Sequence, residues 1–183
     1  AALCELYRKE ERWTELVELH EEAMPGLDER GTVDALQSIL EIQSTHLEMP
    51  ERAFMTAGRL YRLKPEDIDA AQSLIDLGDS LGCVDEAVAI LEDQLDDIRD
   101  SRIRLSRLLQ VGDLYHRTLK DFDEAEGAFE RALEIDPNTP ESRRLLAVPF
   151  VGKDVPSMAS EFAHPDIVIG LATLAYRYEG LRH

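Results

Sequence analysis

Residues 108–137 read LLQVGDLYHRTLKDFDEAEGAFERALEIDP, and this stretch decides the fold. Its apolar side chains recur at helical spacing in two runs, which are Leu108, Val111 and Tyr115, then Ala125, Phe129 and Ala132. A polar turn separates the two runs, and Asp136-Pro137 ends the second one. Two short amphipathic helices joined by a turn cannot bury their apolar faces alone, so the stretch predicts neighbours of the same kind.

This stretch resembles a tetratricopeptide repeat. In that pattern of about 34 residues, a Gly and an aromatic residue mark the first helix, and Ala, an aromatic residue, Ala and a closing Pro mark the second. Six residues occupy those places, namely Gly112, Tyr115, Ala125, Phe129, Ala132 and Pro137. Leu108 replaces the Trp of the first helix, and one extra residue lies between Tyr115 and Ala125.

Weaker copies of the pattern precede this stretch. Ala53 and Ala87 occupy the first Ala position of two further copies and lie 34 residues apart. From Ala87 to Ala125 is 38 residues, which predicts that the second helix of the third copy is one turn longer. Near the start of the chain, Trp13 and Leu16 fit the same spacing, with Leu16 in the Ala position.

The resemblance implies an all-α fold, an α-α superhelix of tetratricopeptide-like helix pairs of the bacterial scaffold type. We expect the pairs at about residues 1–30, 33–66, 68–100 and 102–138, with the start of another at 139–147. Because the chain begins inside an expected helix with no capping residue before it, we also expect it to be a fragment of a longer protein.

Residues 148–183 differ from the repeats in composition. Pro149, Gly152, Pro156 and Pro165 indicate an irregular connection. Apolar residues then return at helical spacing, at Ile167, Leu171, Leu174, Tyr178 and Leu181. They predict a terminal helix that caps the last pair, or that lies in a groove of its own or of a second copy, through which the chain would self-associate.

The net charge of the chain is −18. It argues against nucleic acid and anionic membrane surfaces as partners, because both attract clustered Lys and Arg. Residues 66–100 hold twelve acidic residues and one Arg, a net charge of −11. This run is either a solvated helix surface or a surface for a basic partner. Arg102, Arg104 and Arg107 follow it and are expected to neutralise acidic neighbours.

Other sequence features bear on the compartment. No apolar run of 18 residues occurs, so no membrane span is expected. Cys4 and Cys83 are isolated, which favours buried thiols in a reducing, cytoplasmic compartment.

Residues 78–82, GDSLG, match the nucleophile motif of α/β-hydrolases and resemble the signature of GDSL-type esterases. That chemistry needs Ser80 on a sharp strand-to-helix turn, whereas the residues before it, Ala71, Leu74 and Ile75, have helical spacing. His20-Glu21-Glu22 lacks the second His of a zinc motif, and no phosphate-binding loop occurs. We therefore expect no catalytic residue, no metal and no cofactor.

The repeat resemblance implies a peptide-binding surface on the concave side, formed by the first helices of the pairs. Candidate residues are Ser38, Ile42 and Thr45 in the second copy, Asp69, Gln72, Asp76 and Asp79 in the third, and Ser106, Leu109, Asp113 and His116 in the fourth. We predict a non-catalytic protein-interaction scaffold that binds a basic or amphipathic peptide segment. The alternatives are a serine esterase using Ser80 and an internal spacer whose surface binds nothing specific.

Overall fold

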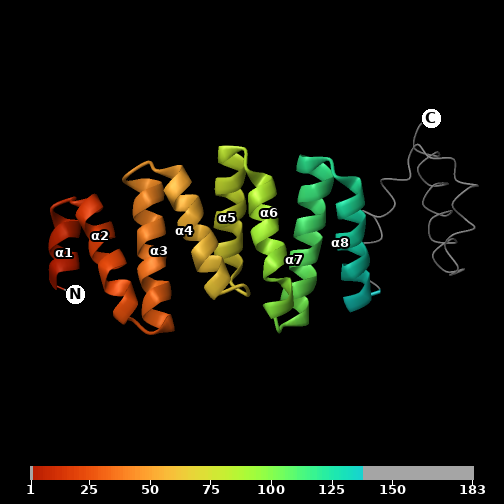
Figure 1. The fold of residues 1–183 in the computed structure, drawn as a ribbon, viewed down its shortest axis with the longest axis horizontal. Coiled ribbons are helices and arrows are strands. Elements are labelled where there is room, and N and C mark those ends of the chain that lie inside the picture. Colours follow the sequence, from red (N-terminus) through yellow and green to blue (C-terminus); the bar gives the residue numbers. More distant parts are fainter. Residues whose placement is uncertain (1, 138–183) are drawn as a thin grey trace, which may run out of the picture.

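The computed structural model describes residues 2–137, which form eight α-helices and no strand. The helices lie side by side in chain order in one row, as Figure 1 shows. They are α1 (Ala2–Lys9), α2 (Trp13–Ala23), α3 (Glu29–Thr45), α4 (Pro50–Leu63), α5 (Ile68–Leu81), α6 (Val84–Asp93), α7 (Ser101–Leu114) and α8 (Phe122–Ile135). This architecture confirms the all-α repeat array. The expected fifth pair and terminal helix lie outside the described residues.

Short polar residues set where the helices begin and end. Asp67 caps α5, because its carboxylate accepts the backbone N–H groups of Asp69 and Ala70 at 3.0 and 3.1 Å. Asp100 caps α7 in the same way. Gly82 ends α5 with a φ of 71°, a left-handed conformation that glycine adopts at little cost. The capping residues therefore fix the bounds of the two helices that flank α6.

The core lies between successive helices and has no centre common to the whole row. The largest apolar cluster runs from α3 to α8, through residues that include Leu36, Phe54, Leu74, Val111 and Ala128. A second cluster holds α2 against α3, and a third packs α7 and α8 around Leu95 and Ile98. Each pair is therefore stabilised by its neighbours, as the repeat pattern predicts. None of the helices in the described part of the chain is both long and apolar enough to cross a bilayer.

Small residues allow the closest helix approaches. At Gly78 of α5, an added Cβ would lie 3.0 Å from the Cβ of Ala87 on α6. At Gly112 of α7, an added Cβ would overlap the ring of Phe129 on α8. Ala87 and Phe129 are fully buried. The residues that mark the repeat in the sequence are therefore packing positions between the two helices of a pair.

The prediction of a longer second helix in the third copy is wrong, because α6 has only 10 residues. The extra length lies in the fourth pair, where the π-helical turn η3 (Tyr115–Leu119) follows α7. A π turn accommodates an inserted residue within a continuous helix. The Tyr115 hydroxyl donates to Glu92 Oε2 at 2.8 Å, which holds the turn against α6. The Tyr115 carbonyl accepts the Asp121 N–H at 3.1 Å, which closes the turn before α8.

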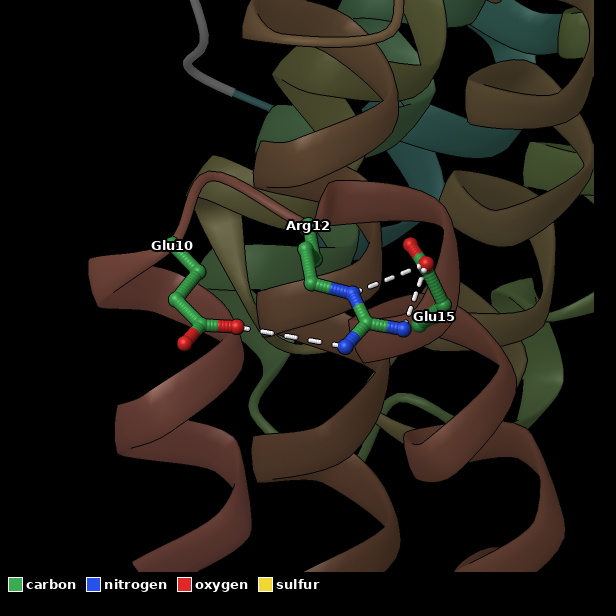
Figure 2. Close-up of polar contacts among 3 residues, drawn as sticks. All are labelled: Glu10, Arg12 and Glu15. Carbon is green, nitrogen blue, oxygen red and sulfur yellow. Dashed lines mark hydrogen bonds and ion pairs between the residues drawn. The ribbon is translucent and has the colours of Figure 1, made fainter.

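The turn between α1 and α2 is organised by Arg12, shown in Figure 2. Its guanidinium contacts Glu10 at 3.9 Å and Glu15 at 2.9 Å, and it lies 4.7 Å from the centroid of the Tyr7 ring. A backbone hydrogen bond and then the hydrogen bond from Arg12 lower the pKa of Glu15. The arginine thus joins the end of α1 to the first turn of α2.

Trp13 at the start of α2 stacks on His46, which follows α3, with ring centroids 3.7 Å apart and an interplanar angle of 5°. Trp13 is the only tryptophan of the chain, so its fluorescence reports this contact. His46→Ala should expose the indole to water and shift its emission to longer wavelength. The control is His116→Ala, because the His116 ring contacts Phe122 and not Trp13. This variant should leave the tryptophan emission unchanged. An unshifted spectrum for His46→Ala would contradict the stack.

Candidate functional site

A cleft of about 320 Å³ lies between α3 and α5, the first helices of the second and third pairs. Its lining residues come from three helices and the turn before α5, and they are Gln37, Leu40, Glu41, Ser44, Leu60, Asp67, Asp69, Ala70 and Ser73. Leu40, Leu60 and Ala70 give it an apolar surface, and the carboxylates of Glu41 and Asp69 are exposed at it. Within the described chain no lysine or arginine lines this cleft, so its potential is negative.

Helical spacing explains why these residues meet. Gln37, Glu41 and Ser44 are separated by four and three residues, so they share one face of α3. Asp69 and Ser73 are four residues apart and share one face of α5. The cap at Asp67 fixes where α5 begins and therefore which of its faces meets α3. The cleft is thus set by the register of two helices.

The structure corrects the expected place of the candidates on α3. Ile42 is only 2% exposed and packs in the core with Leu16, Val17 and Ile39. Ser38 and Thr45 do not line the cleft, and their hydroxyls donate to carbonyls one turn back, those of Asp34 and Glu41, at 3.0 and 2.6 Å.

The face that lines the cleft is offset by one residue from the predicted one: Gln37, Glu41 and Ser44 instead of Ser38, Ile42 and Thr45. The prediction counted back 34 residues from the third copy. However, the loop between α3 and α4 has four residues, whereas the loop between α5 and α6 has two. A one-residue offset turns a helix face by about 100°. The signal in the sequence that could have identified the cleft residues of α3 is the helical spacing shared by Gln37, Glu41 and Ser44.

The candidates on α5 divide between two sides of the helix. Asp69 lines the cleft toward α3. Gln72 lies toward α7, because its side-chain oxygen accepts a hydrogen bond from Gln110 at 3.4 Å, and its amide donates to Asp76 at 2.7 Å. Asp79, in the last turn of α5, is exposed. Asp76 and Gln72 therefore form a second polar strip, between α5 and α7.

Arg107 of α7 lies in the interior at this second strip and is 4% exposed. Its guanidinium donates to Gln110 Oε1 at 2.6 Å and to the Asp67 carbonyl at 3.5 Å, and it lies 5.4 Å from the centroid of the Tyr61 ring. Burial raises the pKa of Tyr61. Among residues 2–137 no carboxylate forms an ion pair with Arg107, so the expectation that it neutralises an acidic neighbour is wrong.

The candidates on the fourth pair do not line the cleft. Leu109 is half-buried against the apolar cluster around Leu95 and Ile98. Asp113 forms an ion pair with Arg117 at 2.7 Å. His116 is half-buried, with its ring edge-on to Phe122, and Ser106 is exposed on α7. The structure therefore brings together Asp69 with new residues of α3, and leaves the fourth-pair candidates apart from them.

The GDSLG segment forms the C-terminal turn of α5. The Ser80 hydroxyl donates to the carbonyl of Leu77 at 2.8 Å, and Gly82 ends the helix. A nucleophile elbow is instead a strained turn between a strand and a helix. In the described part of the chain, no three His, Cys, Asp or Glu side chains form a group that could hold a metal ion.

Comparison with known families agrees with this architecture. A family model described as tetratricopeptide repeat matches residues 1–33 and 108–142, which include α1 with α2, and the second half of α7 with α8. A second model, described as protein of unknown function (DUF3645), matches residues 140–172, beyond the described part. No curated protein matches the chain. The repeat matches fall on the first and the last helix pair of the described chain, and these two stretches are similar to the tetratricopeptide repeat family.

Proposed function

We propose that this chain is a non-catalytic protein-interaction module, and that the cleft between α3 and α5 binds a basic or amphipathic peptide segment of a partner protein. Tetratricopeptide repeats typically act in protein–protein interaction, which is the general basis of the proposal. The observation that carries it is the composition of the cleft. Glu41 and Asp69 are exposed beside an apolar surface formed by Leu40, Leu60 and Ala70.

Lysine and arginine side chains fit such a surface. Their methylene stems pack on apolar groups while the charged end group stays at the polar rim. Here the stem would lie on half-buried Leu40, and the cation would donate hydrogen bonds to the carboxylates of Glu41 and Asp69. The net charge of −11 over residues 66–100 would attract a basic segment from a distance and favour its correct orientation.

The geometry at Ser80 supports a non-catalytic role. Its hydroxyl lies in a helical turn and donates to a backbone carbonyl of the same helix, instead of lying next to a histidine at a strand end. Against a simple spacer role stands the cleft itself, in which two exposed acidic side chains, Glu41 and Asp69, lie beside half-buried Leu40.

Peptide-binding measurements test the proposal. Fluorescence anisotropy with basic and with acidic peptide libraries, at low and at physiological salt, should show a preference for basic peptides that weakens as salt rises. Glu41→Gln/Asp69→Asn should lower the affinity about tenfold, equivalent to about 1.4 kcal/mol. Glu130→Gln/Glu134→Gln, which neutralises two exposed acids of α8, is the control matched in charge. Equal binding of acidic peptides, or equal loss in the control, would contradict a site at the cleft.

A further inference from the structure

Helix α4 presents a basic face in a strongly acidic chain. Residues 50–64 hold Arg52, Arg59, Arg62 and Lys64 with one acid, Glu51, a net charge of +3 against −18 for the whole chain. Arg52, Met55, Arg59 and Arg62 follow one another at steps of three, four and three residues, so they share one face of α4. All four are exposed, and Met55 is 69% exposed.

The three arginines of this face are not occupied by carboxylates. Among residues 2–137, none of them forms an ion pair, although acidic residues greatly outnumber basic ones in the chain. Arg59 makes one contact of note, from Nη2 to the sulfur of Met24 at 3.4 Å. Their guanidinium groups therefore keep most of their hydrogen-bonding capacity for another molecule.

We propose that this face of α4, which we call the arginine face (Arg52, Met55, Arg59 and Arg62), docks an acidic amphipathic helix of a partner protein. Arginine and methionine are both enriched in protein interfaces. Arg52 and Arg62 are ten positions apart along the helix, about 15 Å, which matches about three turns of a second helix. Carboxylates on those turns would pair with the guanidinium groups, and an apolar residue between them would cover Met55.

The charge of the chain favours a short acidic protein segment over other anionic occupants. A nucleic acid is a long polyanion, and the net charge of −18 around the arginine face would repel its phosphates. A second copy carries the same charge of −18 and meets the same repulsion. A single helix needs to bring carboxylates to only three guanidinium groups. This site differs from the proposed cleft, to which α4 contributes only Leu60 and none of the four residues of the arginine face, and it selects the opposite charge.

The probe is a fluorescein-labelled synthetic amphipathic helix with Glu on one face and Leu at its centre, together with the same peptide with every Glu replaced by Gln. The Glu peptide should bind the full chain and the Gln peptide should not. Arg52→Gln/Arg59→Gln/Arg62→Gln should reduce the affinity for the Glu peptide at least tenfold, and Met55→Ser should reduce it several-fold. These residues are exposed, so circular dichroism should show unchanged helix content.

The matched control removes three exposed arginines elsewhere, in Arg99→Gln/Arg102→Gln/Arg131→Gln, and should bind the Glu peptide as the parent does. An equal loss in this control would mean that only net charge matters, and would overturn the proposal. The proposal would also be overturned if the parent failed to bind the Glu peptide. It would be overturned as well if a single-stranded oligonucleotide of the same charge bound as tightly as the Glu peptide. Analytical ultracentrifugation tests whether a second copy of the chain occupies the arginine face. A dimer that is lost only in Arg52→Gln/Arg59→Gln/Arg62→Gln would assign the face to a second copy and refute the partner helix.

Discussion

Replacing Gly112 by alanine is expected to lower the free energy of unfolding by an amount at the upper end of about 1–3 kcal/mol, the cost of overpacking a well-packed site. The new Cβ would lie 2.7 Å from Cδ1 and Cζ of Phe129, closer than carbon atoms approach in proteins. Phe129 is fully buried on α8, so its ring has no free space into which to move. Urea denaturation followed by circular dichroism measures the change.

Gly127→Ala provides the matched control, because Gly127 also lies inside a helix and no atom stands within 4 Å of the position of its new Cβ. Alanine is preferred over glycine in a helix interior, so this variant should be more stable than the parent by about 0.5–1 kcal/mol. The two variants make the same chemical change with opposite expected signs. Equal stabilisation by both would mean that helix propensity, and not contact with Phe129, governs the effect at Gly112.

Phe129→Leu separates the contact from other effects of the Gly112 change. Alone, it removes part of a buried ring and destabilises the fourth pair. Combined with Gly112→Ala, it frees space where the new methyl group lies, so the double variant should lose less stability than the sum of the two single variants. Strict additivity would contradict a direct contact between α7 and α8 at this point.

The packing positions of the fourth pair could be predicted from the sequence because local chemistry determines them. Ala125, Phe129 and Ala132 are fully buried, and Gly112 contacts Phe129, as the repeat pattern requires. These residues lie within one helix pair, where spacing along the chain converts directly into position on a helix. Local chemistry also sets where α5 and α7 begin, since Asp67 caps α5 and Asp100 caps α7, as aspartate commonly does.

The cleft could be predicted only in part, because it depends on the relative register of two helices from different pairs. Asp69, predicted on the peptide-binding side, lines the cleft, whereas Ile42 was assigned to the same surface and lies in the core. Loop lengths differ between pairs, so a constant repeat step does not carry the positions of α5 onto α3. The buried position of Arg107 could not be foreseen either, because its stack on Tyr61 joins residues 46 positions apart.

The cleft proposal also makes a prediction about charge reversal. Glu41→Lys/Asp69→Lys should abolish the preference for basic peptides and lower their affinity at least 100-fold, equivalent to about 2.7 kcal/mol. The reason is that a lysine of the peptide would then face two lysines at the same cleft, and like charges brought together in an interface cost several kcal/mol. Anisotropy titrations at low and physiological salt measure the change.

The reversed cleft should in addition bind acidic peptides that the parent rejects, because its apolar surface of Leu40, Leu60 and Ala70 is unchanged. Glu130→Lys/Glu134→Lys on α8 makes the same change in net charge away from the cleft and serves as the control. It should keep the parent's preference for basic peptides, with only the modest weakening that a less negative chain produces at low salt. If the control switches preference as fully as the cleft variant, the selectivity belongs to the total charge of the protein. If neither variant switches, Glu41 and Asp69 do not contact the peptide.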